Sequence, residues 1–197
     1  MKHIECVVSG GGPIIAIPSE LAQRWRGTLP PLGVTVPPGW TWGQGGILCD
    51  YDRACDDLHD VIEVGDSSAW TVPIADGRAL VLDGETSTAA VPWEDGVVLV
   101  RAPPFETEEE AREVLASITP QIWRASPHRL TLREGRLFVF DSAWEGASTS
   151  SAIGAEGGVL DIRIEPGRYG VTYAAQPCFN DGGTYPLIRL SPVPNES

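Results

Sequence analysis

The fold is decided by the stretch Val159–Ala174, which reads VLDIRIEPGRYGVTYA. From Leu160 to Glu165, apolar and charged residues alternate, which is the period of a strand with one buried face. The segment Glu165–Arg168 contains a Pro-Gly pair and predicts a type II turn. The residues after it alternate again, so the sequence predicts a second strand that follows the turn.

Similar patterns recur along the rest of the chain. Short apolar or alternating runs, many of them bounded by Gly, Pro or Asp, predict further strands at Ile4–Val8, Pro13–Ile17, Val61–Val64, Ala69–Ile74, Arg78–Leu82, Gly96–Arg101, Arg129–Leu132, Arg136–Asp141 and Leu187–Leu190. The pair Asp76-Gly77 is a hairpin signal between two of them. We therefore expect an α+β protein that is mostly antiparallel β, with two or three short helices and a C-terminal half that resembles a β-sandwich.

The expected domain organisation follows from the same patterns. Residues 1–120 contain all the expected helices and form an α+β region, whereas residues 127–197 are β-rich. The boundary falls near Pro120–Pro127. The two regions either stand apart or pack as one continuous domain.

Three segments predict helices. The strongest is Glu108–Ile118, because Thr107 and Glu110 form a T-x-x-E capping box before an apolar stripe. A second helix is expected over Glu20–Arg26, with Ser19 as its N-cap and Gly27 as its C-terminal stop. A third is expected over Asp50–Leu58, with Asp50 as its N-cap.

The segment from Thr28 to Gly46 has a different composition. It is rich in proline and glycine, shows no helix or strand period, and contains Trp40 and Trp42. Loops of this length are often functional, and two tryptophans in such a loop could anchor a partner. The alternative is that both indole rings fold back onto the core.

Charge and composition exclude some classes of function. The net charge is −13, from 14 basic and 27 acidic residues, which disfavours nucleic-acid binding and favours a basic partner. No stretch approaches the roughly 20 apolar residues that a membrane helix needs. The N-terminal segment shows no secretory signal, so we expect a cytoplasmic protein whose four cysteines are free thiols.

The glycine string Ser9-Gly10-Gly11-Gly12-Pro13 invites comparison with a phosphate-binding loop. A Walker loop, however, requires a lysine and a Ser or Thr that opens a helix, and neither is present here. We therefore interpret the string as a tight turn that needs a positive φ.

An acidic segment extends from Asp50 to Asp66 with Arg53 as its only basic residue. One interpretation is an acidic surface that contacts a basic partner. The other is a solvated polar face whose carboxylates also cap helices.

Two other functions remain open at this point. Asp50, Asp52, Cys55 and His59 could serve a small metal- or thiol-dependent hydrolase, since Cys55 and His59 would share one face of a helix. The C-terminal half, with Trp144, could instead form a ligand-binding β-sandwich.

Several strings together resemble the immunity protein 21 family, the antitoxins of bacterial polymorphic toxin systems. The most specific is Asp50-Tyr51-Asp52-Arg53-Ala54-Cys55. The others are the glycine string with the apolar run behind it, Leu21–Gly27, Val61–Gly65, Ala79–Glu85 and Gly96–Arg101.

The resemblance implies a protein that binds and neutralises a cognate toxin and has no catalytic residue, cofactor or metal. An interface of about 1,600 Å² needs a few aromatic or charged anchors. Loop position and acidity predict that these anchors are Trp40, Trp42, Asp50, Asp52, Asp56, Asp57 and Asp60.

Overall fold

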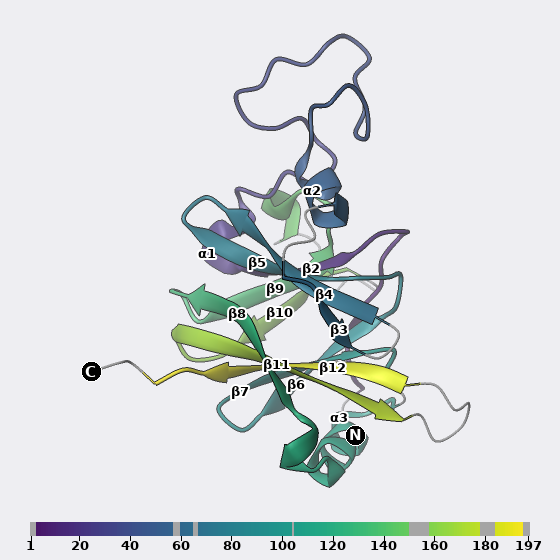
Figure 1. Cartoon of the computed structure of the whole chain (residues 1–197), viewed down its shortest axis with the longest axis vertical. Coiled ribbons are helices and arrows are strands. Elements are labelled where there is room, and N and C mark those ends of the chain that lie inside the picture. Colours follow the sequence, from purple (N-terminus) through teal and green to yellow (C-terminus); the bar gives the residue numbers. More distant parts are fainter. Residues whose placement is uncertain are drawn as a thin grey trace.

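Two six-stranded sheets, packed face to face, form the body of the protein (Figure 1). The computed structural model describes residues 3–56, 60–64, 67–103, 105–149, 158–177 and 184–194. The first sheet has the order β1 (Cys6–Val7), β6 (Thr88–Trp93), β7 (Gly96–Arg101), β12 (Thr184–Pro192), β11 (Gly167–Pro177), β8 (Arg124–Leu132). The second has the order β10 (Leu160–Arg163), β9 (Arg136–Asp141), β2 (Ile14–Pro18), β5 (Gly77–Leu82), β4 (Ser67–Ile74), β3 (Ile62–Val64).

Every strand pair in both sheets is antiparallel, which confirms the predicted mostly antiparallel β class. Each sheet combines strands from residues 1–120 with strands from residues 127–197. For example, β2 pairs with β9 and β7 pairs with β12. The sandwich is thus built by both parts of the chain together.

The stretch Val159–Ala174 connects the two sheets. β10 alternates buried and more exposed residues as predicted, and it pairs with β9 in the second sheet. β11 pairs with β8 and β12 in the first sheet. The segment at Glu165–Arg168 therefore carries the chain from one sheet to the other, an outcome that local alternation does not reveal.

Three apolar layers stabilise this arrangement. The central layer lies between the sheets and includes Ile14, Leu80, Leu99 and Ile188. A second layer covers the outer face of the second sheet with Trp25 and the short helices α1 (Ser19–Ala22) and α2 (Asp50–Asp56). A third covers the outer face of the first sheet with α3 (Glu108–Ser117). Because both faces of each sheet are covered, strands such as β2 and β7 are buried along their whole length.

Helix α3 confirms its sequence signal, because both hydrogen bonds of the Thr107–Glu110 capping box are present. The prediction for α1 was wrong in length and in its cap. No side chain caps its N-terminus, and the Ser19 hydroxyl instead donates to Glu134. Beyond Ala22 the N–H groups of Arg24 and Trp25 make i→i−3 bonds to Leu21 and Ala22, and the N–H of Arg26 donates to the Asp50 carboxylate.

Five further elements complete the comparison with the predicted boundaries. β6 had no sequence signal, and the predicted strand at Ile4–Val8 is reduced to β1. β8 begins earlier than predicted and contains Pro127, which an edge strand tolerates. Two 3₁₀ turns, η1 (Pro120–Ile122) and η2 (Gly146–Ser148), follow α3 and β9.

Candidate functional site

The glycine string and the Asp-Tyr-Asp-Arg-Ala-Cys string meet at one end of the sandwich. A Cβ atom placed on Gly12 would lie 2.6 Å from Cε2 and 2.9 Å from Cζ of Tyr51, so only a glycine allows the Tyr51 ring to approach so closely. The backbone N–H of Tyr51 also donates to the Gly27 carbonyl at 3.0 Å. We call this region, made of the 9–13 turn, the 28–48 loop, α2 and the 141–144 turn, the α2 end (top of Figure 1).

The glycine string forms the tight turn that its sequence predicts. The Ser9 hydroxyl accepts hydrogen bonds from the N–H groups of Gly11 and Gly12, at 3.1 and 2.8 Å. The Asp141 carboxylate accepts from the N–H of Gly10 at 2.7 Å, and Gly11 has a φ of 134°. Since the chain itself binds these three N–H groups, the turn is not available as a phosphate cradle.

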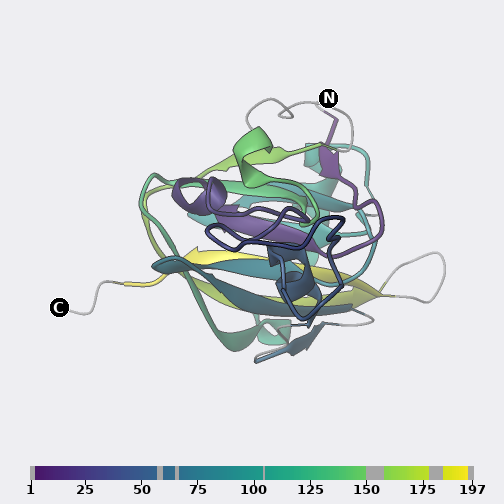
Figure 2. The ribbon, with the colours of Figure 1, turned by 90° about the horizontal axis from the view of Figure 1, so that it is seen from above.

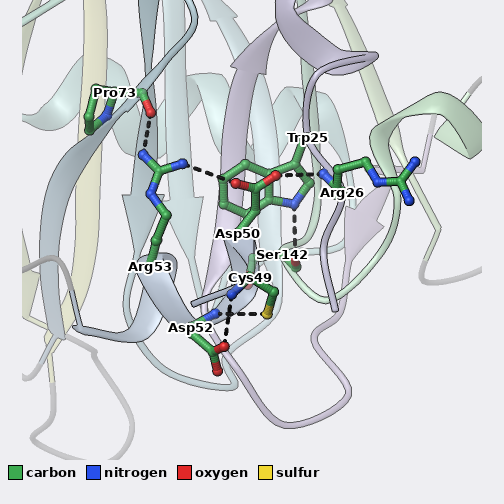
Figure 3. Close-up of polar contacts among 8 residues, drawn as sticks. All are labelled: Trp25, Arg26, Cys49, Asp50, Asp52, Arg53, Pro73 and Ser142. Carbon is green, nitrogen blue, oxygen red and sulfur yellow. Dashed lines mark hydrogen bonds and ion pairs between the residues drawn. The ribbon is translucent and has the colours of Figure 1, made fainter. Parts of the chain in front are cut away.

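Helix α2 begins with a reciprocal pair of hydrogen bonds that resembles a capping box (Figure 3). The Asp52 carboxylate accepts from the N–H of Cys49 at 3.0 Å, and the N–H of Asp52 donates to the Cys49 Sγ at 3.4 Å. The prediction of Asp50 as the N-cap was therefore wrong by one position. Cysteine is not a typical cap, so sequence propensity does not point to Cys49.

The carboxylate of Asp50 ties α2 to its neighbours. It accepts from the N–H of Arg26 at 2.7 Å and from Nη1 of Arg53 at 3.0 Å (Figure 3). Arg53 in turn donates to the carbonyl of Pro73 on β4. Asp52 is buried and also accepts from the N–H of Gly43 at 3.3 Å, which ties the 28–48 loop to α2. Both carboxylates thus hold this end together.

The other predicted anchors differ in their exposure. Trp42 is 50% exposed and packs edge-on against Tyr51, with 5.1 Å between the ring centroids. Trp40 is half-buried, and its indole N–H donates to the carbonyl of Gln44 at 3.2 Å. Asp56 and Asp60 are exposed, and Asp57 lies outside the described residues.

Aromatic side chains surround a depression of about 440 Å³ at the α2 end. The residues that line it come from all four parts of this end: Gly10, Gly11, Gly12, Thr28, Trp42, Tyr51, Asp141, Ala143 and Trp144. The sequence patterns suggest a binding role for Trp144 only in the C-terminal half, and none for Tyr51 or Asp141. Gly10 and Asp141 are separated by 131 positions, so no local pattern indicates their contact.

The geometry does not favour the hydrolase alternative. Burial raises the pKa of the Cys55 thiol above its ordinary value, and burial raises that of Cys49 to about 11, so both thiols stay protonated at neutral pH. Within the part of the chain that the structure describes, no group of three His, Cys, Asp or Glu side chains is placed to hold a metal ion. His59 lies outside that part.

The 28–48 loop projects from the sandwich above α2, as the dark blue trace in Figure 1 shows, and Figure 2 views it from above.

The described helices include none that is long and apolar enough to cross a bilayer.

Comparison with known proteins gives one match. A sequence model of the family described as immunity protein 21 matches residues 5–180, which extends the similarity well beyond the first half of the chain. No curated protein and no solved structure matches the chain.

Proposed function

Because the chain belongs to the immunity protein 21 family, we propose that it binds a cognate bacterial toxin in a stoichiometric complex and neutralises it. In this proposal the protein acts in the cytoplasm and performs no chemistry of its own. The α2 end is the toxin-binding surface, with Trp42 near its centre.

The supporting observation is the distribution of exposed apolar side chains. Large apolar residues that remain exposed gather at the α2 end: Leu29, Leu32, Val34, Trp42, Leu48 and Trp144. Among the described residues, Val8 and Val61 are the other members of this class. Exposed apolar residues that form a contiguous patch mark interaction surfaces, and tryptophan is enriched among the residues that dominate binding energy.

The acidic side chains of the predicted site fall into two groups with different roles. Asp50 and Asp52 support the surface, since their carboxylates bind the backbone and Arg53. Asp56 is exposed at the end of α2 and adds negative charge to the α2 end, whereas Asp60 is exposed beside His128 of β8, outside this end. With a net charge of −13, such a rim favours association with a basic toxin.

Calorimetry with the toxin domain encoded beside this gene tests the proposal. We expect one-to-one binding whose affinity falls as the salt concentration rises, because exposed charges are screened. Absence of binding to this toxin would contradict the proposal.

A charge reversal tests the placement of the interface. Asp56→Lys should weaken toxin binding by about tenfold, mainly through a slower association rate. The matched control is Glu113→Lys, which makes the same change of charge on the exposed face of α3 at the opposite end. Equal effects of the two substitutions would show that net charge, rather than the α2 end, determines binding.

A further inference from the structure

The depression at the α2 end has three aromatic walls. Trp42 and Tyr51 contact each other edge to face at an interplanar angle of 79°, so their ring planes are nearly perpendicular. Trp144 lines the same depression from the 141–144 turn and is 40% exposed. Faces and edges of indole rings thus remain accessible beside a polar floor.

The floor is held by hydrogen bonds within the chain. Oδ2 of Asp141 accepts from Gly10 and Oδ1 accepts from Ala143, at 2.7 and 2.9 Å. The carbonyl of Ala143 accepts from the N–H of Thr28 at 3.1 Å, and Ser142 binds the carbonyl of Pro13 through both its N–H and its hydroxyl. A floor fixed in this way costs little conformational entropy when a ligand binds.

The carboxylates of Asp141 and Asp52 make the electrostatic potential at Tyr51 negative. Burial raises the pKa of Tyr51 to about 12, and the neighbouring Cys55 thiol and the Asp141 and Asp52 carboxylates add to this shift because they disfavour a phenolate. The Glu85 carboxylate lies near the glycine turn, with Oε1 3.9 Å from the position that a Cβ on Gly11 would take.

No basic residue is among the described residues that line the depression. Arg53 of α2 and the neighbouring Arg26 are engaged elsewhere, since Arg26 pairs with Glu145 and Arg53 pairs with Asp50. Each oxygen of Asp141 accepts one N–H, whereas an ionised carboxylate offers about four acceptor sites. The depression therefore combines aromatic rings with unused capacity to accept hydrogen bonds from a cation.

We propose that the depression receives one arginine side chain of the bound toxin, with its guanidinium group against the indole rings of Trp42 and Trp144 and facing Asp141. The proposal rests on the toxin-binding function proposed above. Arginine is preferred to lysine because its planar, weakly hydrated group stacks on aromatic faces and donates several hydrogen bonds at once. A volume of about 440 Å³ accommodates one such side chain.

The first test measures toxin affinity in variants of the walls. Trp42→Ala and Trp144→Ala should each weaken binding by about 30-fold, as expected for residues at the centre of an interface. Leu32→Ala is the matched control, because Leu32 is 60% exposed in the same loop but does not line the depression, and it should cost only a few-fold. Unchanged affinity in both tryptophan variants would overturn this inference and the placement of Trp42 near the centre of the interface. One-to-one binding of the toxin by the wild-type protein would still support toxin binding as the function.

The second test needs no toxin. N-acetyl-arginine methylamide is titrated into the protein while the indole ¹H–¹⁵N signals are followed by NMR, with Trp42 and Trp144 assigned from the alanine variants. We expect saturable shifts of these two indole signals, and no such shifts with the citrulline analogue, which is uncharged but nearly the same shape. Equal shifts with citrulline, or tighter binding of the lysine analogue, would overturn the assignment to arginine.

Discussion

Each of the two ends of the molecule covers the outer face of one sheet, but with different elements. At the α3 end (residues 105–123), one helix closed by a Thr–Glu capping box covers the outer face of the first sheet. At the opposite end, α1 and Trp25 join α2 in covering the outer face of the second sheet, and the long loop of the α2 end projects beyond them (Figure 1). Both arrangements place one layer of buried apolar side chains on the outer face of a sheet.

They differ in what they leave exposed. Among the described residues, the α3 end contributes no large apolar side chain to the exposed class, whereas the α2 end contributes six, which are named above. Because the large apolar side chains described at the α3 end are not exposed, we expect substitutions there to affect stability rather than toxin binding. The α2 end leaves apolar side chains exposed to solvent, as a protein-binding surface does.

The largest expected effects come from truncating the core of each end. Trp25→Ala should lower the free energy of unfolding by about 4 kcal/mol, because the side chain is fully buried and its indole N–H donates to the Ser142 carbonyl at 2.8 Å. Leu115→Ala at the α3 end should cost about 3 kcal/mol. Urea denaturation measures both.

Measurements of toxin affinity should then distinguish the roles of the two ends. Trp25→Phe, which keeps most of the apolar volume, should weaken binding because it releases the 141–144 turn under the depression. Leu115→Ala should bind normally at a temperature at which it remains folded. Weaker binding in Leu115→Ala than in Trp25→Phe would contradict the assignment of roles to the two ends.

The two helix caps provide the next comparison. Asp52→Ala removes a buried carboxylate that accepts from the N–H groups of Cys49 and Gly43, and should cost about 2 kcal/mol. Thr107→Ala removes the hydroxyl that accepts from the N–H of Glu110 at 3.3 Å and should cost about 1 kcal/mol.

Hydrogen exchange distinguishes a local from a global effect of these caps. In Asp52→Ala the amides of Gly43 and Cys49 should exchange faster than the amides of the sheets, and toxin affinity should fall. Thr107→Ala should affect only the first turn of α3. If the 28–48 loop exchanged equally in wild-type protein and Asp52→Ala, the loop would not depend on this carboxylate.

The contrast also explains which elements the sequence could predict. α3 was correctly predicted because its signals are local, namely a T-x-x-E box and an apolar stripe within one segment. α2 was predicted with the wrong cap because a cysteine sulfur replaces the usual oxygen acceptor. β6, with the sequence TAAVPW, lacks a run of β-branched residues and is defined by its pairing with β7.

Contacts between distant residues account for the rest. The assignment of β10 and β11 to different sheets depends on their partners β9 and β12, not on their own alternation. In the same way, the sequence predicted Trp42 as a binding residue. It did not predict that Tyr51, Asp141 and Trp144 would be its neighbours in the depression. Two of the short strings that carry the family resemblance pack together at Gly12 and Tyr51, although they lie about forty residues apart.

The last expected difference between the ends concerns their stability at alkaline pH. Burial, with a contribution from Asp52, raises the pKa of Cys49 from 9.0 to about 11. Below pH 9 the thiol is protonated in both the folded and unfolded states, so it adds no pH dependence. Between pH 9 and 11 the unfolded state releases this proton more readily, and the free energy of unfolding falls.

Cys49→Ser should therefore reduce the loss of stability between pH 9 and 11, since serine caps a helix and does not titrate in this range. Other buried groups with a raised pKa, including Cys6, Cys55 and Tyr51, should leave part of the loss in place. The Thr107 cap has no such group, and Thr107→Cys should introduce an additional alkaline loss at the α3 end. Urea denaturation at several pH values measures both variants, and an unchanged pH profile in Cys49→Ser would show that the Cys49 thiol does not limit the stability of the α2 end.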